Sequence, residues 1–323
     1  MAAAFYLPEK YLPAAGLREA WVSGRMRQME QGGKIATAQT WIYQTWANLK
    51  AMGFEAPLVF EMPKRGIVIT LSGFFPDAFR PPADLFFAAV VADGLPHPAA
   101  HLHIVQNAAH AARLAGSVYL PHWPHPNLVP RRESRGGKFE TLAFFGDPVN
   151  LAPELKGNEW KERLERELGI SFEIRNADRW HDYSDVDCVL AIRDFSGRAQ
   201  VHKPATKLYN AWLAAVPFIG GAESAYASDG RGGIDHLVAR TPEAAFEHLS
   251  RLKADAAFRK KLVTAGTESG TRFSLAATTS RWQQLVARDL PARAEKWFRK
   301  PPVSRGLSGW LQRARVFVDR RLR

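Results

Sequence analysis

Residues 187–226 read DCVLAIRDFSGRAQVHKPATKLYNAWLAAVPFIGGAESAY. Residues 189–192 form a short apolar run bounded by charge, which predicts a buried strand. Pro204 suits the first turn of a helix, where a missing N–H costs nothing, and apolar residues recur at helical spacing after it. Residues 216–219 predict the next strand, and a glycine turn follows it. The stretch therefore predicts a β-α-β unit.

Two lysines lie at the start of the predicted helix. The free N–H groups and the dipole of a helix N-terminus favour an anion, and the ammonium groups of Lys203 and Lys207 strengthen that preference. Thr206 adds a hydroxyl that either binds the anion or makes a first-turn capping contact. We therefore predict a phosphate-binding site here; the alternative is a pair of solvated lysines on a helix surface.

The run KPATKLYNAWLAAVPFIGGAESAY, residues 203–226, resembles the nucleotide-sugar-binding core of GT-B glycosyltransferases. In that fold a helix of the C-terminal domain points its N-terminus at the donor diphosphate. A small-Val-Pro-hydrophobic strand and a Gly-rich turn follow, as in residues 215–221 here. Many retaining members carry two glutamates eight positions apart across this helix, where this chain has His202 and Asn210. The resemblance implies an α/β fold of two Rossmann-like, doubly wound domains facing a cleft.

The resemblance also implies which residues contact the donor. Lys203, Lys207 and Arg193 would neutralise the leaving diphosphate, although Arg193 could equally pair with the aspartate that follows it. Asn210 would hold the nucleotide. Glu223 would orient the sugar, and the alternative for it is an acidic first helical turn. Strand ends and turns supply the other expected donor contacts, which are Gly146, Thr206, Gly221 and Ser224.

The length of 323 residues indicates about two domains. The single cysteine, Cys188, excludes a disulfide framework and a CxxC metal site, and its place in an apolar run predicts a buried side chain. No apolar run approaches the roughly 18 residues that a membrane-spanning helix needs. The N-terminus lacks the basic-then-apolar pattern of a signal peptide. We therefore expect a cytoplasmic protein.

Positive charge is concentrated at the C-terminus. The net charge is +12, and residues 291–323 supply +8 of it through ten Lys or Arg residues against two acids. With its interspersed aromatic residues, this tail suits an amphipathic helix at an anionic membrane surface, which would make the protein peripheral at the inner membrane face. The alternative is a helix packed on the body of the protein. Nucleic-acid binding is not expected, because the rest of the chain is only mildly basic.

Residues 121–140 are rich in Pro, Arg and Gly and mark the predicted domain boundary. Helix and strand patterns alternate on both sides of it, which predicts mostly parallel sheets. We therefore predict a Rossmann-like acceptor domain over residues 1–130, a nucleotide-sugar-binding domain over 131–290, and a basic amphipathic tail over 291–323.

Six of the ten histidines lie within residues 97–125. Their spacing fits no common pair of zinc ligands, so a metal site is not expected. A histidine has a pKa suited to a general base that activates an acceptor hydroxyl. The candidate bases are His101, His103 and Asp93, and the expected acceptor contacts are His122, Trp123 and Asn107. Among these, His122 also competes as the base, and packing at a hinge is the alternative role of Trp123.

These observations predict glycosyl transfer from a nucleotide sugar to the hydroxyl of a glycan or lipid-linked acceptor, in cell-surface polysaccharide assembly. No obligatory metal or other cofactor is expected. Asp185 and Asp187 match a DxD metal motif only as letters, because they precede a buried strand. Two alternatives stay open: a nucleotide-sugar epimerase or hydrolase of the same fold, and a non-catalytic basic membrane- or RNA-binding protein.

Overall fold

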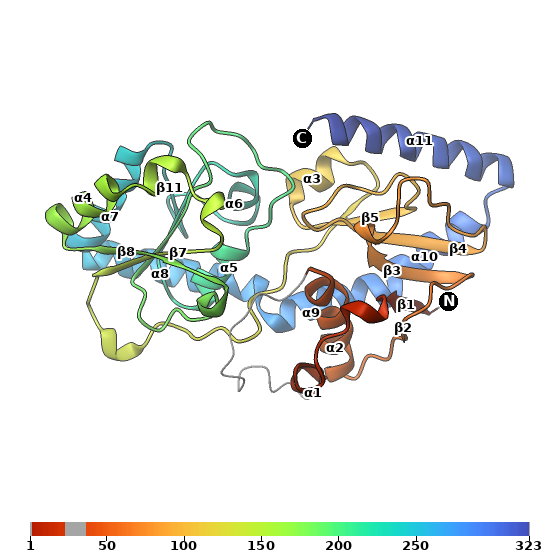
Figure 1. Cartoon of the computed structure of the whole chain (residues 1–323), viewed down its shortest axis with the longest axis horizontal. Helices are drawn as coiled ribbons and strands as arrows, with labels where there is room; N and C mark the ends of the chain where they lie inside the picture. The colour runs from red at the N-terminus through yellow and green to blue at the C-terminus, as the bar shows by residue number, and fades with distance from the viewer. Residues whose placement is uncertain (1, 23–36, 323) are drawn as a thin grey trace. The chain divides into compact units, whose positions relative to one another are not determined.

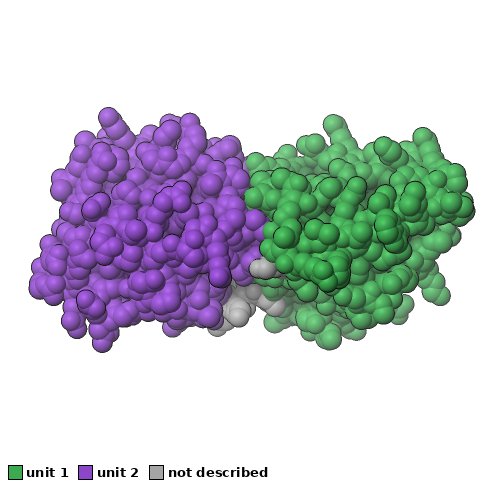
Figure 2. All heavy atoms as spheres, turned by 90° about the horizontal axis from the view of Figure 1, so that it is seen from above, with its two compact units in different colours: residues 1–26, 35–121, 278–323 green, residues 27–34, 122–277 purple. Residues whose placement is uncertain are grey.

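The computed structural model of the chain describes residues 2–22 and 37–322. The chain divides into two compact units, which Figure 2 shows in different colours. Among the described residues, unit 1 consists of 2–22, 37–121 and 278–322, and unit 2 of 122–277. The chain therefore leaves unit 1, builds unit 2, and returns to complete unit 1.

Unit 1 is built on a parallel sheet with the strand order β2-β1-β3-β4-β5-β6. The apolar run LFFAAV forms β4, and all six of its residues are buried, as expected for a parallel strand that is covered on both faces. Figure 1 shows α2 and α9 on one side of this sheet and α3 and α11 on the other. The strands are β1 (Ala3–Tyr6), β2 (Leu58–Val59), β3 (Gly66–Leu71), β4 (Leu85–Val90), β5 (Leu102–Val105) and β6 (Val118–Tyr119).

The helices of unit 1 come from both parts of the chain. Residues 39–51 form a π-helical turn followed directly by α2. The α-helices are α1 (Ala15–Val22), α2 (Gln44–Ala51), α3 (Ala108–Arg113), α9 (Leu275–Gln284), α10 (Leu290–Phe298) and α11 (Pro302–Arg321). The π-helical turns are η3 (Gln39–Tyr43) and η10 (Leu285–Asp289), and the 3-10 turns are η1 (Glu9–Tyr11) and η4 (Ser72–Phe74).

Unit 2 contains a second parallel sheet, with the order β11-β10-β9-β7-β8. The predicted α/β class with two Rossmann-like parallel sheets is therefore confirmed. The strands are β7 (Thr141–Phe145), β8 (Ser171–Arg175), β9 (Cys188–Ala191), β10 (Phe218–Gly220) and β11 (Leu237–Val238). The helices are α4 (Asn158–Leu168), α5 (Thr206–Leu213), α6 (Ser224–Asp229), α7 (Pro242–Ala254) and α8 (Ala256–Gly270). The 3-10 turns are η5 (Glu133–Arg135), η6 (Pro148–Asn150), η7 (Pro153–Leu155), η8 (Ala177–Arg179) and η9 (Thr271–Phe273).

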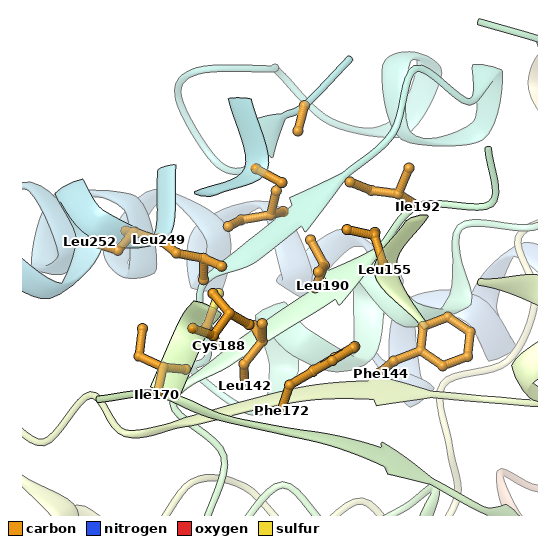
Figure 3. Packing of buried hydrophobic residues seen from close by; sticks show 14 of the residues in the cluster. Leu142, Phe144, Leu155, Ile170, Phe172, Cys188, Leu190, Ile192, Leu249 and Leu252 are labelled. Atoms are coloured by element: carbon orange, nitrogen blue, oxygen red, sulfur yellow. The ribbon is translucent and has the colours of Figure 1, made fainter. Parts of the chain in front are cut away.

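An apolar core lies on each face of the unit 2 sheet. On one face α4 and α7 contribute side chains such as Leu164 and Leu249 to a core that includes Leu142 and Leu190 of the strands. Figure 3 labels Leu249, Leu142 and Leu190 in this core. Cys188 belongs to this core, and burial raises the pKa of its thiol, so it is a small apolar side chain and not a nucleophile. On the other face α5 and α6 cover the sheet with a core of mostly aromatic and small residues.

The predicted β-α-β unit is present as β9, α5 and β10, shifted by one or two residues from the predicted boundaries. Helix α5 begins at Thr206 with Ala205 as its N-cap, so Pro204 precedes the first turn. The turn from α5 to β10 places Ala215 at a φ of 55°, a backbone region that a small residue tolerates better than a large one. The Thr241 hydroxyl caps α7 by accepting a 3.1 Å hydrogen bond from the N–H of Ala244.

The unit boundaries differ from the predicted ones for a physical reason. Unit 2 begins at His122 and not at residue 131, because the segment before residue 131 is bonded to unit 2. The N–H of His125 donates to Oδ1 of Asn210 at 3.0 Å, and the N–H of Val129 donates to the carbonyl oxygen of His181 at 2.8 Å. Residues 278–290 belong to unit 1, because buried side chains such as Trp282 pack there. The second aspartate of the DxD match, Asp187, is buried and binds two arginines. The Nε atoms of Arg131 and Arg135 lie 3.0 and 2.8 Å from its Oδ1.

Asp187 lies at the amino ends of the unit 2 strands. Besides the two arginines, its carboxylate accepts hydrogen bonds from the N–H groups of Glu140 and Thr141, at 2.9 and 3.0 Å. Burial by itself would raise the pKa of Asp187, but these hydrogen bonds and the arginines lower it. Asp187 is therefore a fully partnered structural carboxylate at the end of the sheet opposite to the carboxyl ends of the strands.

Candidate functional site

The carboxyl ends of β7, β9 and β10 lie next to one another in the unit 2 sheet. In an open parallel sheet this is the edge at which ligands bind. Three predicted residues follow these strands directly, since Gly146 follows β7, Arg193 comes shortly after β9, and Gly221 follows β10. Helix α5 begins after the loop that leaves β9. The sequence therefore brings the predicted donor contacts to one edge.

Lys207 and Gly146 are in close contact. A Cβ atom added to Gly146 would lie 3.2 Å from Cε and 3.4 Å from Nζ of Lys207. Gly146 also has a φ of 148°, a backbone angle that residues other than glycine rarely adopt. The ammonium group lies 5.3 Å from the ring centroid of Phe144. Lys207 therefore extends back from the first turn of α5 across the end of β7, and a glycine is needed for it to do so.

The N-terminus of α5 has no side-chain cap. Its N-cap is Ala205, which offers no acceptor to the first-turn N–H groups. The hydroxyl oxygen of Thr206 is buried and has no hydrogen-bond partner among the described residues, so Thr206 does not make the capping contact that was its alternative role. Lys203 lies in the preceding turn, where its N–H donates to the carbonyl oxygen of Gln200 at 2.9 Å. The first-turn N–H groups, the hydroxyl of Thr206 and two lysines thus lie close together in the chain at the start of α5.

Glu223 is a buried acid beside this edge. Its side chain is 5% exposed, and its Oε1 accepts a 3.1 Å hydrogen bond from the N–H of Arg193. Its other oxygen, Oε2, is buried and has no partner among the described residues. Burial raises the pKa of this carboxyl group above its usual range. A Cβ on Gly221 would lie only 2.5 Å from Oε2, so Gly221 leaves the room that this carboxyl group occupies.

Arg193 connects the ends of β7 and β9. Its Nη1 donates to Oδ1 of Asn150 at 2.7 Å, and Asn150 ends the short helical turn η6 that follows β7. Asp194 accepts hydrogen bonds from the N–H of Ser196 at 2.9 Å and from Nε2 of Gln200 at 3.1 Å. Asp194 therefore shapes the loop before α5, and the structure shows Arg193 paired with Asn150 instead.

Two further predicted donor contacts have structural partners. The N–H of Ser224 donates to the carbonyl oxygen of Ala199 at 2.8 Å, which fastens the β9–α5 loop to the start of α6. Asn210 is buried on α5, and its Oδ1 accepts a 3.0 Å hydrogen bond from the N–H of His125. The amide oxygen of Asn210 thus anchors the segment that enters unit 2.

The carboxyl edge of the unit 1 sheet gathers a smaller group of polar residues. Asp93 follows β4 and is exposed, and its Oδ1 accepts a 3.0 Å hydrogen bond from Nε2 of Gln106, which follows β5. Asn107 is the N-cap of α3, where its Oδ1 accepts from the N–H of Ala109 at 2.9 Å. Of the three candidate bases, the structure therefore places only Asp93 at this edge.

His101 and His103 lie deeper in unit 1. His101 precedes β5, its Nδ1 accepts a 2.8 Å hydrogen bond from the N–H of Phe87, and its ring contacts Trp297. His103 is fully buried within β5, with Nε2 2.9 Å from the carbonyl oxygen of His97. Burial lowers the pKa of each imidazole to about 4. Both rings are therefore neutral packing residues at physiological pH, and neither lies at a strand's carboxyl end.

The expected acceptor contacts His122 and Trp123 lie at the start of unit 2. Nδ1 of His122 is 2.7 Å from the carbonyl oxygen of Trp123. The Trp123 side chain is only 1% exposed, so its ring has no open face for a sugar to stack on. The packing role that was the alternative for Trp123 fits this burial.

Known structures share the fold of this chain. Anabaena HepE in complex with UDP-glucose aligns with 89% of this chain and 100% of its own, with a TM-score of 0.53 and 10% identity. AviGT4, a glycosyltransferase involved in avilamycin A biosynthesis, covers 89% of this chain and 98% of its own, with a TM-score of 0.50 and 15% identity. The pneumococcal O-GlcNAc transferase GtfA, in complex with UDP and GlcNAc, has a TM-score of 0.51 at 12% identity. The chain has the GT-B glycosyltransferase fold.

The extent of the similarity differs between these proteins. This chain spans 59% of GtfA and 59% of sucrose-phosphate synthase from Thermosynechococcus elongatus, whose TM-score is 0.44, but the whole of HepE. No protein-family model matches the sequence, and the search of curated proteins finds no match. The GT-B fold is thus recognised here from the structure and from the residue pattern around α5.

Within this GT-B fold, no group of three or more His, Cys, Asp or Glu side chains in residues 2–22 and 37–322 is arranged to hold a metal ion. The electrostatic groups at the unit 2 edge are instead Lys203, Lys207, Arg193 and the α5 N-terminus. Asn150 and Gln106, which hold Arg193 and Asp93, are not among the donor and acceptor contacts expected from the sequence. Each carries an amide and lies just past the carboxyl end of a parallel strand, which is the signal that could have marked it.

Proposed function

We propose that the protein is a glycosyltransferase that moves a sugar from a nucleotide-sugar donor to a hydroxyl group of a glycan or lipid-linked acceptor. The proposal depends on one observation: Lys207 crosses Gly146 at the carboxyl edge of the unit 2 sheet, beside the uncapped N-terminus of α5. The names of HepE and GtfA, crystallised with UDP-glucose or with UDP and GlcNAc, support the choice of ligand.

The donor diphosphate would bind at the start of α5. Lys207 and Lys203 would neutralise its charge, and the first-turn N–H groups would donate to its oxygens. The buried hydroxyl of Thr206, which has no partner in the part of the chain that the structure describes, would gain an acceptor. Because the leaving nucleotide carries the charge that develops as the glycosidic bond breaks, these groups stabilise the transition state.

Glu223 would orient the sugar. Its buried Oε2 has no hydrogen-bond partner in residues 2–22 and 37–322, and a sugar hydroxyl would supply one. The raised pKa favours the protonated carboxyl group, which can donate as well as accept. Arg193, held by Asn150, would add a further positive charge near the phosphates, and Gly221 and Ser224 would keep the turn around Glu223 in place.

Activation of the acceptor is assigned to Asp93 in unit 1. Its carboxylate is exposed, and the amide of Gln106 fixes its position at the end of β4. If the reaction inverts the anomeric centre, Asp93 would accept the proton of the acceptor hydroxyl. The acceptor is proposed to belong to cell-surface polysaccharide assembly, and the reaction to take place on the cytoplasmic side. No obligatory metal or other cofactor is proposed.

Isothermal titration with UDP and with UDP-glucose tests the donor site. We expect K203Q/K207Q to bind UDP about 100-fold more weakly, since each charge-assisted contact contributes about 1.5–3 kcal/mol. The control is K260Q/K261Q, which removes the same charge from exposed lysines on α8 of the same unit. Equal UDP affinity in the two variants would contradict the proposal.

A panel of UDP, GDP, dTDP and CMP sugars, screened by thermal unfolding, tests the substrate class. A ligand at 100 times its dissociation constant stabilises the folded state by about 2.7 kcal/mol, which raises the melting temperature measurably. We expect at least one donor to do so. If none shifts the transition, neither the glycosyltransferase nor the related epimerase or hydrolase function stands. Donor turnover without an acceptor would favour the hydrolase.

A further inference from the structure

Helix α11 lies along the outside of unit 1, beside α3 (Figure 1). It has 20 residues, of which only Val316 and Asp319 are buried. None of the helices in residues 2–22 and 37–322 combines the length and the apolar content that crossing a bilayer requires. The side chains that attach α11 to unit 1 determine which face of this helix stays exposed.

The inner face of α11 is attached through polar groups. Asp319 accepts hydrogen bonds from Nε of Arg113 at 2.8 Å and pairs with Nε2 of His110 at 3.2 Å. Arg320 binds Asp77, with Nη2 and Oδ1 2.8 Å apart, and Gln312 contacts the buried His103. The buried Val316 packs beside them against Val91, Val105 and Leu114, so the inner face of α11 joins one apolar contact to these charged and amide contacts.

The outer face of α11 is apolar. Val303, Leu307, Trp310, Leu311, Phe317 and Val318 are between 41% and 85% exposed. Spacings of three, four and seven residues place them on one side of a helix. A continuous apolar strip of this kind on the surface of a folded unit indicates a contact with another apolar medium.

Positive charge borders this strip. Helix α11 carries five arginines and one acid, and that acid is the buried, paired Asp319. Arg315 and Arg321 are exposed beside the strip. A groove of about 430 Å³ next to it is lined by Trp310, Phe317, Arg80 and Arg313, and by Arg320 with its partner Asp77. Apolar side chains and guanidinium groups thus meet within one surface.

We propose that the outer face of α11 docks on an anionic lipid bilayer. Trp310 and Phe317 enter the boundary between headgroups and acyl chains, and the arginines at the groove and along the strip bind lipid phosphates. Charge favours this occupant over a second copy of the chain, because two copies meeting through α11 would place like-charged arginines together. The contact holds unit 1 at a membrane surface, where a lipid-linked acceptor would be found.

Sedimentation with vesicles tests the docking surface in the full-length protein without any donor. We expect binding to vesicles of phosphatidylcholine and phosphatidylglycerol in equal parts, little binding to phosphatidylcholine alone, and release by salt. Equal binding to both vesicle types, or none to either, would overturn the proposal. Vesicle binding is independent of sugar transfer, so this result and the UDP titration can fail separately.

Two pairs of variants separate the apolar and the basic contributions. L307S/W310S should reduce vesicle binding at least tenfold, whereas V149S/I234S, which removes exposed apolar residues from unit 2, should not. R315Q/R321Q should reduce it about tenfold relative to K260Q/K261Q. Sedimentation velocity checks the rival occupant: a dimer that L307S/W310S abolishes, with unchanged vesicle binding, would assign the face to a second copy.

Discussion

At the carboxyl edge of the unit 2 sheet, Lys207, Gly146 and Glu223 form a group with unpaired buried polar atoms nearby. At the corresponding edge of the unit 1 sheet, Asp93 and Gln106 bind one another, and the neighbouring histidines are packed inside the unit. At the unit 2 edge, buried polar atoms lack hydrogen-bond partners among the described residues, whereas most polar groups at the unit 1 edge have them. A charged diphosphate requires the first arrangement, whereas a neutral acceptor hydroxyl requires only one exposed base.

Substitution of Asp93 gives the largest expected effect. We expect Asp93→Asn to lower kcat by about 100- to 10,000-fold with little change in donor affinity, because a general base contributes that much to the rate. The measurement is steady-state kinetics with a nucleotide sugar and an acceptor. Asp84→Asn is the matched control, since Asp84 is an exposed aspartate just before the amino end of the same strand. A similar kcat in both variants would move the base elsewhere.

Acidification should destabilise unit 1 through its buried histidines. The pKa of His103 is lowered from 6.5 to about 4, so the unfolded state binds its proton first as the pH falls. His103 does not destabilise the folded protein above pH 6.5. As the pH falls from 6.5 to about 4, this group lowers the free energy of unfolding by about 3 kcal/mol. Urea unfolding from pH 7.5 to 4 measures the loss. His103→Gln should flatten this dependence; an unchanged slope would show that other groups cause it.

Gly146→Ala tests the contact between Gly146 and Lys207. The added Cβ would lie 3.2 Å from Cε of Lys207, and the φ of 148° disfavours any side chain. We expect UDP affinity to fall about tenfold and the free energy of unfolding to fall by about 1–2 kcal/mol. Gly157→Ala is the control, because no atom lies within 4 Å of its added Cβ. Wild-type UDP binding by Gly146→Ala would separate Lys207 from the donor site.

Glu223→Gln gives the smallest effect and the most specific one. Burial disfavours the ionised form of Glu223 in the folded state and so raises its pKa. The group therefore costs the folded state nothing at low pH, and the free energy of unfolding falls as the pH rises through the folded-state pKa. We expect the variant to be about 1 kcal/mol more stable than wild type at pH 8 and equal at low pH. In titrations UDP-glucose should lose its affinity advantage over UDP. Glu154→Gln, an exposed substitution in the same unit, should change neither.

The carboxyl edge of the unit 2 sheet could be predicted because the residues that form it lie close together in the sequence. Strand, loop, helix and second strand follow one another between residues 187 and 226, so a local pattern determines which side chains meet. Gly146 lies outside this stretch, but it follows a strand, and parallel strands end at the same edge.

The unit 1 residues could not be placed in this way. Whether His101 and His103 face solvent or core depends on where β5 begins and on helices that arrive late in the chain, since Trp297 and Gln312 contact them. The burial of Trp123 likewise depends on tertiary packing. The composition of residues 291–323 predicted an amphipathic helix, but only the structure shows that its polar groups face inward.

The interrupted course of unit 1 affects the order in which the protein can fold during synthesis. Phe5 and Trp41 pack near Trp282, with ring centroids 6.5 and 6.4 Å from it, so the earliest strand waits for a residue translated much later. The second sheet is complete by Ala277, so unit 2 can fold before translation of the chain ends. Until release, the first strands expose an apolar surface that a chaperone could shield.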